Sequence, residues 1–157
     1  MTHKGTSNII VDLLDTNGNS VAFGSVANVI GPFQGSTPVQ IPRGADYLLD
    51  VQADGPWQIV VEQPRAASAP QTRSFSGDSQ QATQLFALSA GLHRVHMTHQ
   101  GDSNFIFDLL DENGGSVTLG LANEIGPFDG ARAVQVPVDG IYLFSVQANG
   151  PWTINID

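Results

Sequence analysis

The chain has 157 residues, no cysteine, and a formal net charge of −9 from 15 acidic and 6 basic side chains. This balance argues against nucleic acid and anionic membranes as partners, since both are bound by Lys and Arg side chains that replace counterions. The lack of cysteine excludes disulfide bonds, and no apolar run is long enough to span a bilayer.

The polar composition favours an extracellular β-module over a cytosolic helical enzyme. Only 13% of the residues are charged, and Ser, Thr, Asn, Gln and Gly supply most of the other polar positions. The opening residues 1–4 are not followed by the apolar stretch of a signal peptide. We therefore expect either a cytoplasmic protein or an excised piece of a longer, secreted or cell-surface protein.

The first long predicted strand covers residues 8–15, and a turn with the sequence DTNGNS follows it. Asp15 and Asn17 offer part of the alternating oxygen ligands and glycine bend of a calcium loop, but further acidic ligands and a distal Glu are missing. We expect Asp15 to cap its own turn, with a calcium site as the alternative. Asp12 lies within the strand, and we expect it on a solvated face or bonded to a neighbouring polar side chain such as Gln52.

A Gly-Pro loop, NVIGPFQG, follows at residues 28–35. One interpretation is a structural crossover in which the glycines fit tight turns. The alternative is a binding loop that presents Asn28 and Phe33 to a partner.

Apolar side chains then alternate with polar ones at Tyr47, Leu49 and Val51, and again at Trp57 and Ile59 after an Ala-Asp-Gly-Pro turn. A period of two with one wet face is typical of antiparallel strands. Trp57 is in register with the core positions, so we expect it to be buried and not to form a platform for sugar rings.

Residues 63–73 have the Pro, Ala, Ser and Gln composition of a linker, and a further strand pattern follows within residues 74–96. Phe86, Leu88 and Val95 carry its apolar positions.

Residues 97–157 repeat residues 1–62, with about 35 of roughly 61 aligned positions identical. The offset is 96 up to Gly24 and 95 from residue 26 onward. The counterparts of the residues singled out above are Asp108, Asp111, Asn113, Asn123, Phe128, Gln147 and Trp152. In the structural interpretation of the loop, Ile125 and Phe128 plug the open end of a sandwich.

The pattern predicts an all-β chain of two tandem antiparallel β-sandwich, jelly-roll-like repeats. Residues 1–62 form a repeat that lacks its first strand, residues 63–73 a linker, and residues 74–157 a complete repeat. A sandwich without one strand leaves an open edge and a slot in its core.

Catalytic and metal-binding patterns are weak. On one strand His93 and His99 share a face while His96 points the other way, so the three cannot converge on one metal. His3 and His99 recur at the same position, for which we expect a structural hydrogen bond. No nucleophile elbow, phosphate loop or helical His pair is present, and we expect no enzyme activity and no cofactor, calcium excepted.

The segments FALSAGLHRV, FIFDLLDENG, DGIYLFSV and GPWTINI, in this order, resemble the bacterial pre-peptidase C-terminal domain and related small β-sandwich modules. The resemblance covers residues 74–157 and about three quarters of residues 1–62. It implies a non-catalytic module of a secreted or surface protein, similar to modules that bind collagen or polysaccharide, some of them with calcium. The Gly-Pro loop is not part of the general pattern and indicates an uncharacterised subfamily.

Two functions from different classes follow. The first is a binding or spacer module that contacts a polysaccharide or an extracellular protein. The second is an assembly element in which the vacancy of the first repeat is filled by strand sharing, in a homodimer or with another chain.

Overall fold

The computed structural model describes residues 1–22 and 24–157, and these residues form strands, turns and loops without any helix. The chain is therefore all-β with antiparallel sheets, as predicted. No helix that could cross a membrane occurs among the described residues. The chain divides into two compact units, Met1–Glu62 and Gln63–Asp157, called unit 1 and unit 2 below.

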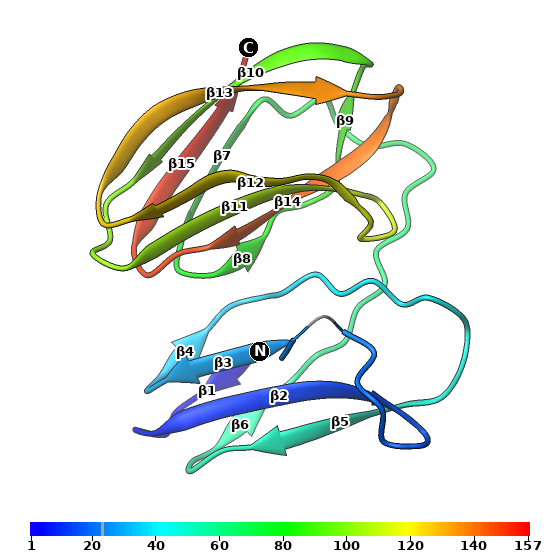
Figure 1. Cartoon of the computed structure of the whole chain (residues 1–157), viewed down its shortest axis with the longest axis vertical. Helices are drawn as coiled ribbons and strands as arrows, with labels where there is room; N and C mark the ends of the chain where they lie inside the picture. The colour runs from blue at the N-terminus through cyan, green and yellow to red at the C-terminus, as the bar shows by residue number, and fades with distance from the viewer. Residues whose placement is uncertain (23) are drawn as a thin grey trace. The chain divides into compact units, whose positions relative to one another are not determined.

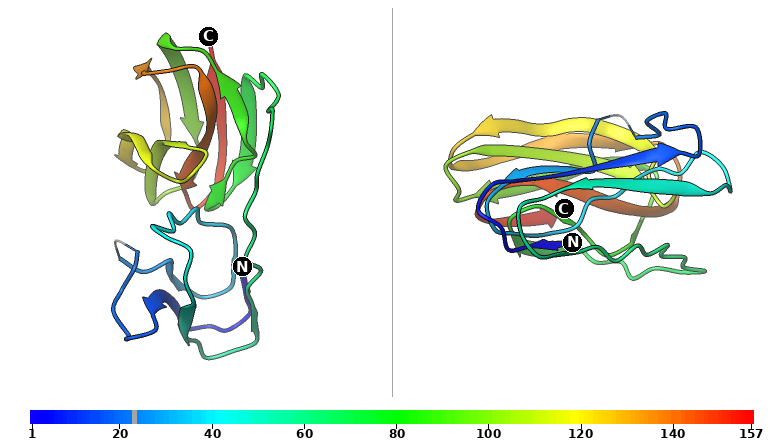
Figure 2. Two further views of the ribbon diagram at one scale, coloured as in Figure 1. Left: turned by 90° about the vertical axis from the view of Figure 1, so that its right-hand side faces the viewer. Right: turned by 90° about the horizontal axis from the view of Figure 1, so that it is seen from below.

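Unit 2 is a sandwich of two antiparallel sheets with strand orders β13-β10-β15-β7 and β12-β11-β14-β8, with β9 also pairing with β14 (Figure 1). Its strands are β7 (Ser74–Asp78), β8 (Gln81–Ala82), β9 (Phe86–Leu88), β10 (Gly91–His99), β11 (Asn104–Asp111), β12 (Ser116–Ile125), β13 (Phe128–Val136), β14 (Gly140–Gln147) and β15 (Pro151–Ile156). Figure 2 shows the same strands in two layers from a further side.

The core of unit 2 lies between the two sheets because alternate residues of each strand point inward. β11 buries Phe105 and Phe107, and β14 buries Phe144. The ring centroids of Phe86 and Phe107 lie 4.7 Å and 4.6 Å, respectively, from that of Phe144. β9 thus contributes a central part of the core.

The alternation of β11 holds through Asp108 and Leu109 and breaks at Leu110. The register with β12 shifts between Phe107 and Leu109 and again before Leu110, and Leu109 and Leu110 are both buried. Asp108 Oδ1 accepts a hydrogen bond of 2.7 Å from the backbone N–H of Gly120. Its partner is therefore the backbone at a β-bulge, and not the side chain of a polar residue on a neighbouring strand.

Unit 1 contains two three-stranded sheets with orders β4-β1-β6 and β3-β2-β5. Its strands are β1 (Thr2–His3), β2 (Asn8–Asp15), β3 (Ala27–Ile30), β4 (Phe33–Gln34), β5 (Tyr47–Gln52) and β6 (Trp57–Gln58). The pairing matches that of unit 2 residue for residue. His3 lies opposite Phe33 and Trp57, as His99 lies opposite Phe128 and Trp152.

The described part of unit 1 has no counterpart of β7, β8 or β9, and this leaves core positions uncovered. The expectation that both tryptophans are buried is wrong for Trp57, which is 49% exposed, whereas Trp152 is 2% exposed. Trp152 lies against Gly77 of β7 and donates its indole N–H to Ser79 O at 2.9 Å. In the described part of unit 1 no strand pairs with β6 on this side of Trp57, and Leu49 on β5 is likewise exposed.

Candidate functional site

A buried histidine holds the Gly-Pro loop in each unit. His3 ends β1 and His99 ends β10, and both side chains are almost fully buried. Their Nδ1 atoms lie 2.9 Å from the carbonyl oxygens of Gly31 and Gly126 respectively. Because a carbonyl only accepts, Nδ1 carries the hydrogen in both rings. The two repeated motifs MTHxG and IGPF are therefore parts of one contact.

The glycine of the loop is fixed from its other side as well. The N–H groups of Gly31 and Gly126 donate to Ser7 O and Ser103 O, each at 2.9 Å. The φ angles are 83° and 88°, in the left-handed region that glycine adopts without a steric penalty. Both backbone polar groups of this glycine are thus hydrogen-bonded, so the loop is held from two sides at this point.

Further glycines make room for the histidine. A Cβ atom on Gly5 or Gly101 would lie 2.5 Å from Nε2 of His3 or His99. It would also collide with the side chain of Asp54 in unit 1 or of Asn149 in unit 2. Glycine is therefore required in the motif MTHxG because neighbouring side chains lie too close for a Cβ atom, and not because its backbone angle is unusual.

The residue at position 54 or 149 fastens the adjacent loop. Asp54 Oδ2 accepts the N–H groups of Thr6 and Ser7, both at 3.0 Å. Asn149 Oδ1 accepts only that of Ser103, at 3.1 Å, and its amide donates to Asp102. The chemistry of this position is the main difference between the two histidine environments.

The carboxylate of Asp54 also faces the histidine. Partial desolvation opposes the charged form of Asp54, but the N–H groups of Thr6 and Ser7 and the nearby His3 hold its pKa below the ordinary value of 3.8. His3 Nε2 lies 3.2 Å from Asp54 Oδ1, without the geometry of a hydrogen bond. In unit 2 His99 Nε2 has no hydrogen-bond partner among the described residues.

The locked loops present aliphatic side chains to solvent. Ile30 is 77% exposed and Ile125 is 81% exposed, and the prolines two residues further on are exposed too. We call the segments Ile30–Pro32 and Ile125–Pro127 the IGP tips. The prediction that Ile125 plugs the end of the sandwich is wrong, because the histidine contact turns the glycine inward and leaves the isoleucine outside.

The four residues predicted to bind a ligand lie on two sides of the loop. Asn28 on β3 and Asn123 on β12 are exposed and lie opposite Ile10 and Ile106. Phe33 is buried, and Phe128 is half-buried against the core of unit 2, with its ring 5.9 Å from that of Phe105. Only the two asparagines are therefore next to the IGP tips on the surface.

The two Asp-x-Asn-Gly turns direct their carboxylates inward. Asp15 Oδ1 accepts the N–H groups of Asn17 and Asn19 at 2.8 Å and 2.9 Å. Asp111 Oδ1 accepts those of Asn113 and Gly115, both at 2.8 Å. The backbone N–H of Asn19 is the main cause that lowers the pKa of Asp15. These contacts are the self-capping turn expected from the sequence.

No group of three or more His, Asp or Glu side chains suited to a metal ion occurs within residues 1–22 and 24–157. His93 Nε2 lies 2.9 Å from Ser89 O, and His96 Nε2 lies 2.7 Å from Asp129 Oδ1. The histidines of β10 thus have separate partners.

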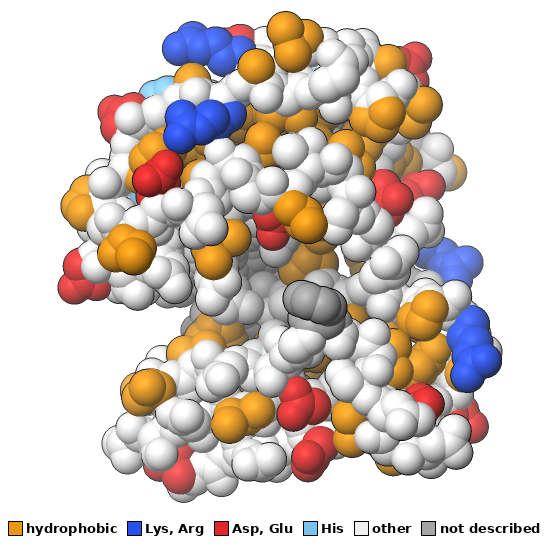
Figure 3. All heavy atoms as spheres, viewed as in Figure 1, with side chains coloured by type: hydrophobic (Ala, Val, Ile, Leu, Met, Phe, Trp, Pro, Cys, Tyr) orange, Lys and Arg blue, Asp and Glu red, His pale blue; other side chains and the backbone are white. Residues whose placement is uncertain are grey.

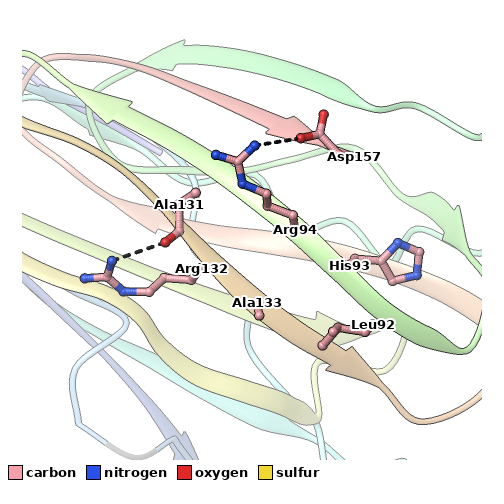
Figure 4. Close-up of a pocket in the computed structure, with 7 residues that line it drawn as sticks. All are labelled: Leu92, His93, Arg94, Ala131, Arg132, Ala133 and Asp157. Carbon is pink, nitrogen blue, oxygen red and sulfur yellow. Dashed lines mark hydrogen bonds and ion pairs between the residues drawn. The ribbon is translucent and has the colours of Figure 1, made fainter.

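A shallow pocket lies on the outer surface of β10 and β13 (Figure 4). It is lined by Leu92, His93, Arg94, Ala131, Arg132, Ala133 and Asp157. Arg94 pairs with Asp157 at 3.4 Å, and Arg132 pairs with Glu124 at 3.3 Å. Because each guanidinium already faces a carboxylate, the pocket is a weaker candidate for a ligand site than the IGP tips.

The sequence alone did not reveal the isoleucines as candidate site residues. Their exposure depends on the histidine contact, which joins segments 28 and 27 residues apart. The one available signal was the recurrence of both motifs in both repeats. Comparisons with protein-family models, with curated proteins and with solved structures found no match to this chain.

Proposed function

We propose that the chain is a non-catalytic binding module that presents its two IGP tips to an extracellular protein. The observation that carries this proposal is the exposure of Ile30 and Ile125 at the same place in both repeats, on loops that are otherwise locked. A single exposed apolar side chain is ordinary on a protein surface. An isoleucine that is exposed at the same position in both repeats, on a loop held by hydrogen bonds, favours a role in contacting a partner.

Rigidity and repetition both suit binding. A loop that is already ordered loses little conformational entropy when it meets a partner, so more of the contact energy appears as affinity. Two copies in one chain can engage a repetitive partner together and raise the apparent affinity through effective concentration. The tandem arrangement is thus part of the proposed function.

The chemistry of the tips favours a protein partner over a polysaccharide. Ile and Pro side chains offer no hydrogen bonds to sugar hydroxyls, whereas the centres of protein interfaces are apolar. The flanking Asn28 and Asn123 would supply polar contacts at the rim. On the face drawn in Figure 3, Lys and Arg side chains are few, in keeping with a partner that is not strongly acidic.

A secreted or cell-surface setting belongs to the same proposal. It is supported by the low fraction of charged residues, 13%, and by the resemblance to pre-peptidase C-terminal modules. The alternative within this class is a spacer that binds nothing.

The test is a binding screen of the intact chain against immobilised collagen, other extracellular matrix proteins and polysaccharides, first with calcium and then with a chelator. Saturable binding to a protein is expected. The double substitution of Ile30→Asp and Ile125→Asp should then weaken binding at least tenfold. Both side chains are solvent-exposed, so the fold should be retained.

The matched control is the double substitution of Leu92→Asp and Leu119→Asp, since these exposed leucines lie outside the tips. It should leave binding within about twofold of the unmodified chain. Saturable binding that survives the isoleucine substitutions would exclude the tips as the contact. Absence of binding in every condition would favour the spacer, and calcium dependence would assign ligand roles to Asp15 and Asp111.

A further inference from the structure

The open side of unit 1 has a filled counterpart in unit 2. The outer edge of β15 pairs with β7, with Trp152 opposite Gly77 and Ile154 opposite Phe75. The outer edge of β14 pairs with β8 and β9, with Tyr142 opposite Phe86. Among the described residues, β6 pairs only with β1 and β5 only with β2. Within residues 1–22 and 24–62, the corresponding edges of unit 1 therefore carry no second paired strand.

The sequences of these edges are nearly the same in both units. YLLDVQ of β5 corresponds to YLFSVQ of β14, and GPWQI around β6 corresponds to GPWTI around β15. An edge that accepts a given strand in unit 2 thus has nearly the same side chains and backbone pattern in unit 1.

The side chains exposed on unit 1 are those that the missing strands would cover. Leu49 is 40% exposed, while its counterpart Phe144 is 1% exposed; Trp57 and Trp152 differ likewise. In unit 2 Phe144 contacts both Phe75 and Phe86, at centroid distances of 5.4 Å and 4.7 Å. The surface around Leu49 and Trp57 is thus an uncovered half of a core rather than an ordinary exterior.

We propose that this open side binds an extended segment of a partner polypeptide with the pattern of residues 74–88, SFSGDSQQATQLFAL. The segment adds one strand along β6 and a second along β5, as β7 to β9 do in unit 2. This mode of recognition is β-augmentation, in which main-chain hydrogen bonds give affinity and alternate side chains give specificity.

The register gives the specificity of the site. Gly77 lies opposite Trp152, and a Cβ atom on Gly77 would be within 2.7 Å of two atoms of the indole. A partner strand must therefore place glycine opposite Trp57. Phe75 lies opposite Ile154, so the same strand carries an aromatic residue opposite Ile59. Phe-x-Gly is the recognition sequence that we infer.

A second copy of this chain is a poorer occupant. Its own residues 74–88 are already paired within unit 2, so an exchange would open one edge for each edge that it closes. A separate polypeptide with the same pattern adds pairing without removing any. This surface is distinct from the IGP tips and does not depend on the function proposed for them.

The test is the titration of a synthetic peptide with the sequence of residues 69–90 into the ¹⁵N-labelled chain. The chain has two tryptophans, one in each unit, so the indole N–H signals report on Trp57 and Trp152 separately. The substitution Trp57→Phe assigns them. Saturable 1:1 binding is expected, with a large shift for Trp57 and none for Trp152.

The control is the same peptide with Gly77→Val, which should bind at least tenfold more weakly because its side chain meets the indole. The chain variant Leu49→Lys should weaken binding of the unmodified peptide, whereas the isoleucine variant of the tips should not. No shift of Trp57, or equal binding of the valine peptide, would overturn the proposal. The proposal would also be overturned if the chain alone sedimented as a dimer and its Trp57 indole signal were already that of a buried side chain.

Discussion

The motif Ala-Asx-Gly-Pro-Trp has Asp54 in unit 1 and Asn149 in unit 2. The two side chains differ in one group, a carboxylate oxygen in place of an amide nitrogen. Asp54 accepts two backbone N–H groups and faces His3, whereas Asn149 accepts one N–H and faces His99. The fold tolerates both, because either side chain offers an oxygen to the loop after the buried histidine. In unit 1 the group that accepts the loop N–H groups is a titratable carboxylate, whereas in unit 2 it is a neutral amide.

The substitution Asp54→Asn is expected to reduce the acid sensitivity of unit 1. The folded pKa of Asp54 lies below the ordinary 3.8, so its contribution to stability is fully present above that value. The contribution is lost as the pH falls through the lowered folded pKa. Urea midpoints followed by Trp57 fluorescence should therefore fall less between about pH 5 and pH 2 in the variant than in the unmodified chain.

Unit 2 of the same variant, followed by Trp152, serves as the control: the residue at the matching position is Asn149, so the acid dependence of its urea midpoint should not change with Asp54→Asn. Asp15 also has a lowered pKa and is present in both proteins. The acid dependence of the urea midpoint of unit 1 should therefore become shallower in the variant but should not disappear. Equal slopes for the variant and the unmodified chain would show that Asp54 is not a source of the acid sensitivity.

At the level of strands, His99 connects the end of β10 to the turn between β12 and β13 through its contact with Gly126 O. Its ring also stacks on Phe105 of β11, with centroids 4.8 Å apart and planes 8° apart. His99 thus links both sheets of unit 2 at one end of the sandwich.

The substitution His99→Phe should keep the stacking but remove the donor to Gly126 O. A buried carbonyl left without a donor costs about 1–3 kcal/mol, so unit 2 should be destabilised by that amount in chemical denaturation. His93→Phe is the matched control on the same strand, because its partner Ser89 O is exposed to water. A cost for His99→Phe no larger than for the control would mean that the loop is held by other contacts.

The alternation of apolar residues predicted the strands and their inward faces, but not which faces would be covered. Leu49 and Trp57 obey the same pattern as Phe144 and Trp152, and differ only in whether neighbouring strands lie beside them. Asp108 is a similar case, since its partner Gly120 is set by a register shift between two strands. Contacts of this kind depend on which segments meet in space, and a local pattern carries no such information.

The repeat gave more information about the site than either copy alone. It singled out the histidine and the Gly-Pro loop as features kept together, although it could not show that they touch. The exposure of Ile30 and Ile125 follows from that contact, and a pattern of apolar residues predicts the opposite.

For the whole molecule, the two units differ in how completely their cores are built. In the described residues, the buried cluster of unit 2 contains Phe86, Leu88 and fifteen further side chains. The buried cluster of unit 1 consists of Ile9, Val11 and Ala27, with partly buried neighbours. Since buried apolar area is the main favourable term in folding, unit 1 should be the less stable unit.

The chain should therefore unfold in urea in two steps, with unit 1 first. Trp57→Phe and Trp152→Phe variants leave one fluorescent reporter in each unit, and the Trp57 signal should change at the lower urea concentration. A saturating strand peptide binds only folded unit 1, so it should stabilise unit 1 by about 2.7 kcal/mol at one hundred times its dissociation constant. The Trp152 transition should stay in place. A single transition seen by both reporters at the same urea concentration would contradict this order of unfolding.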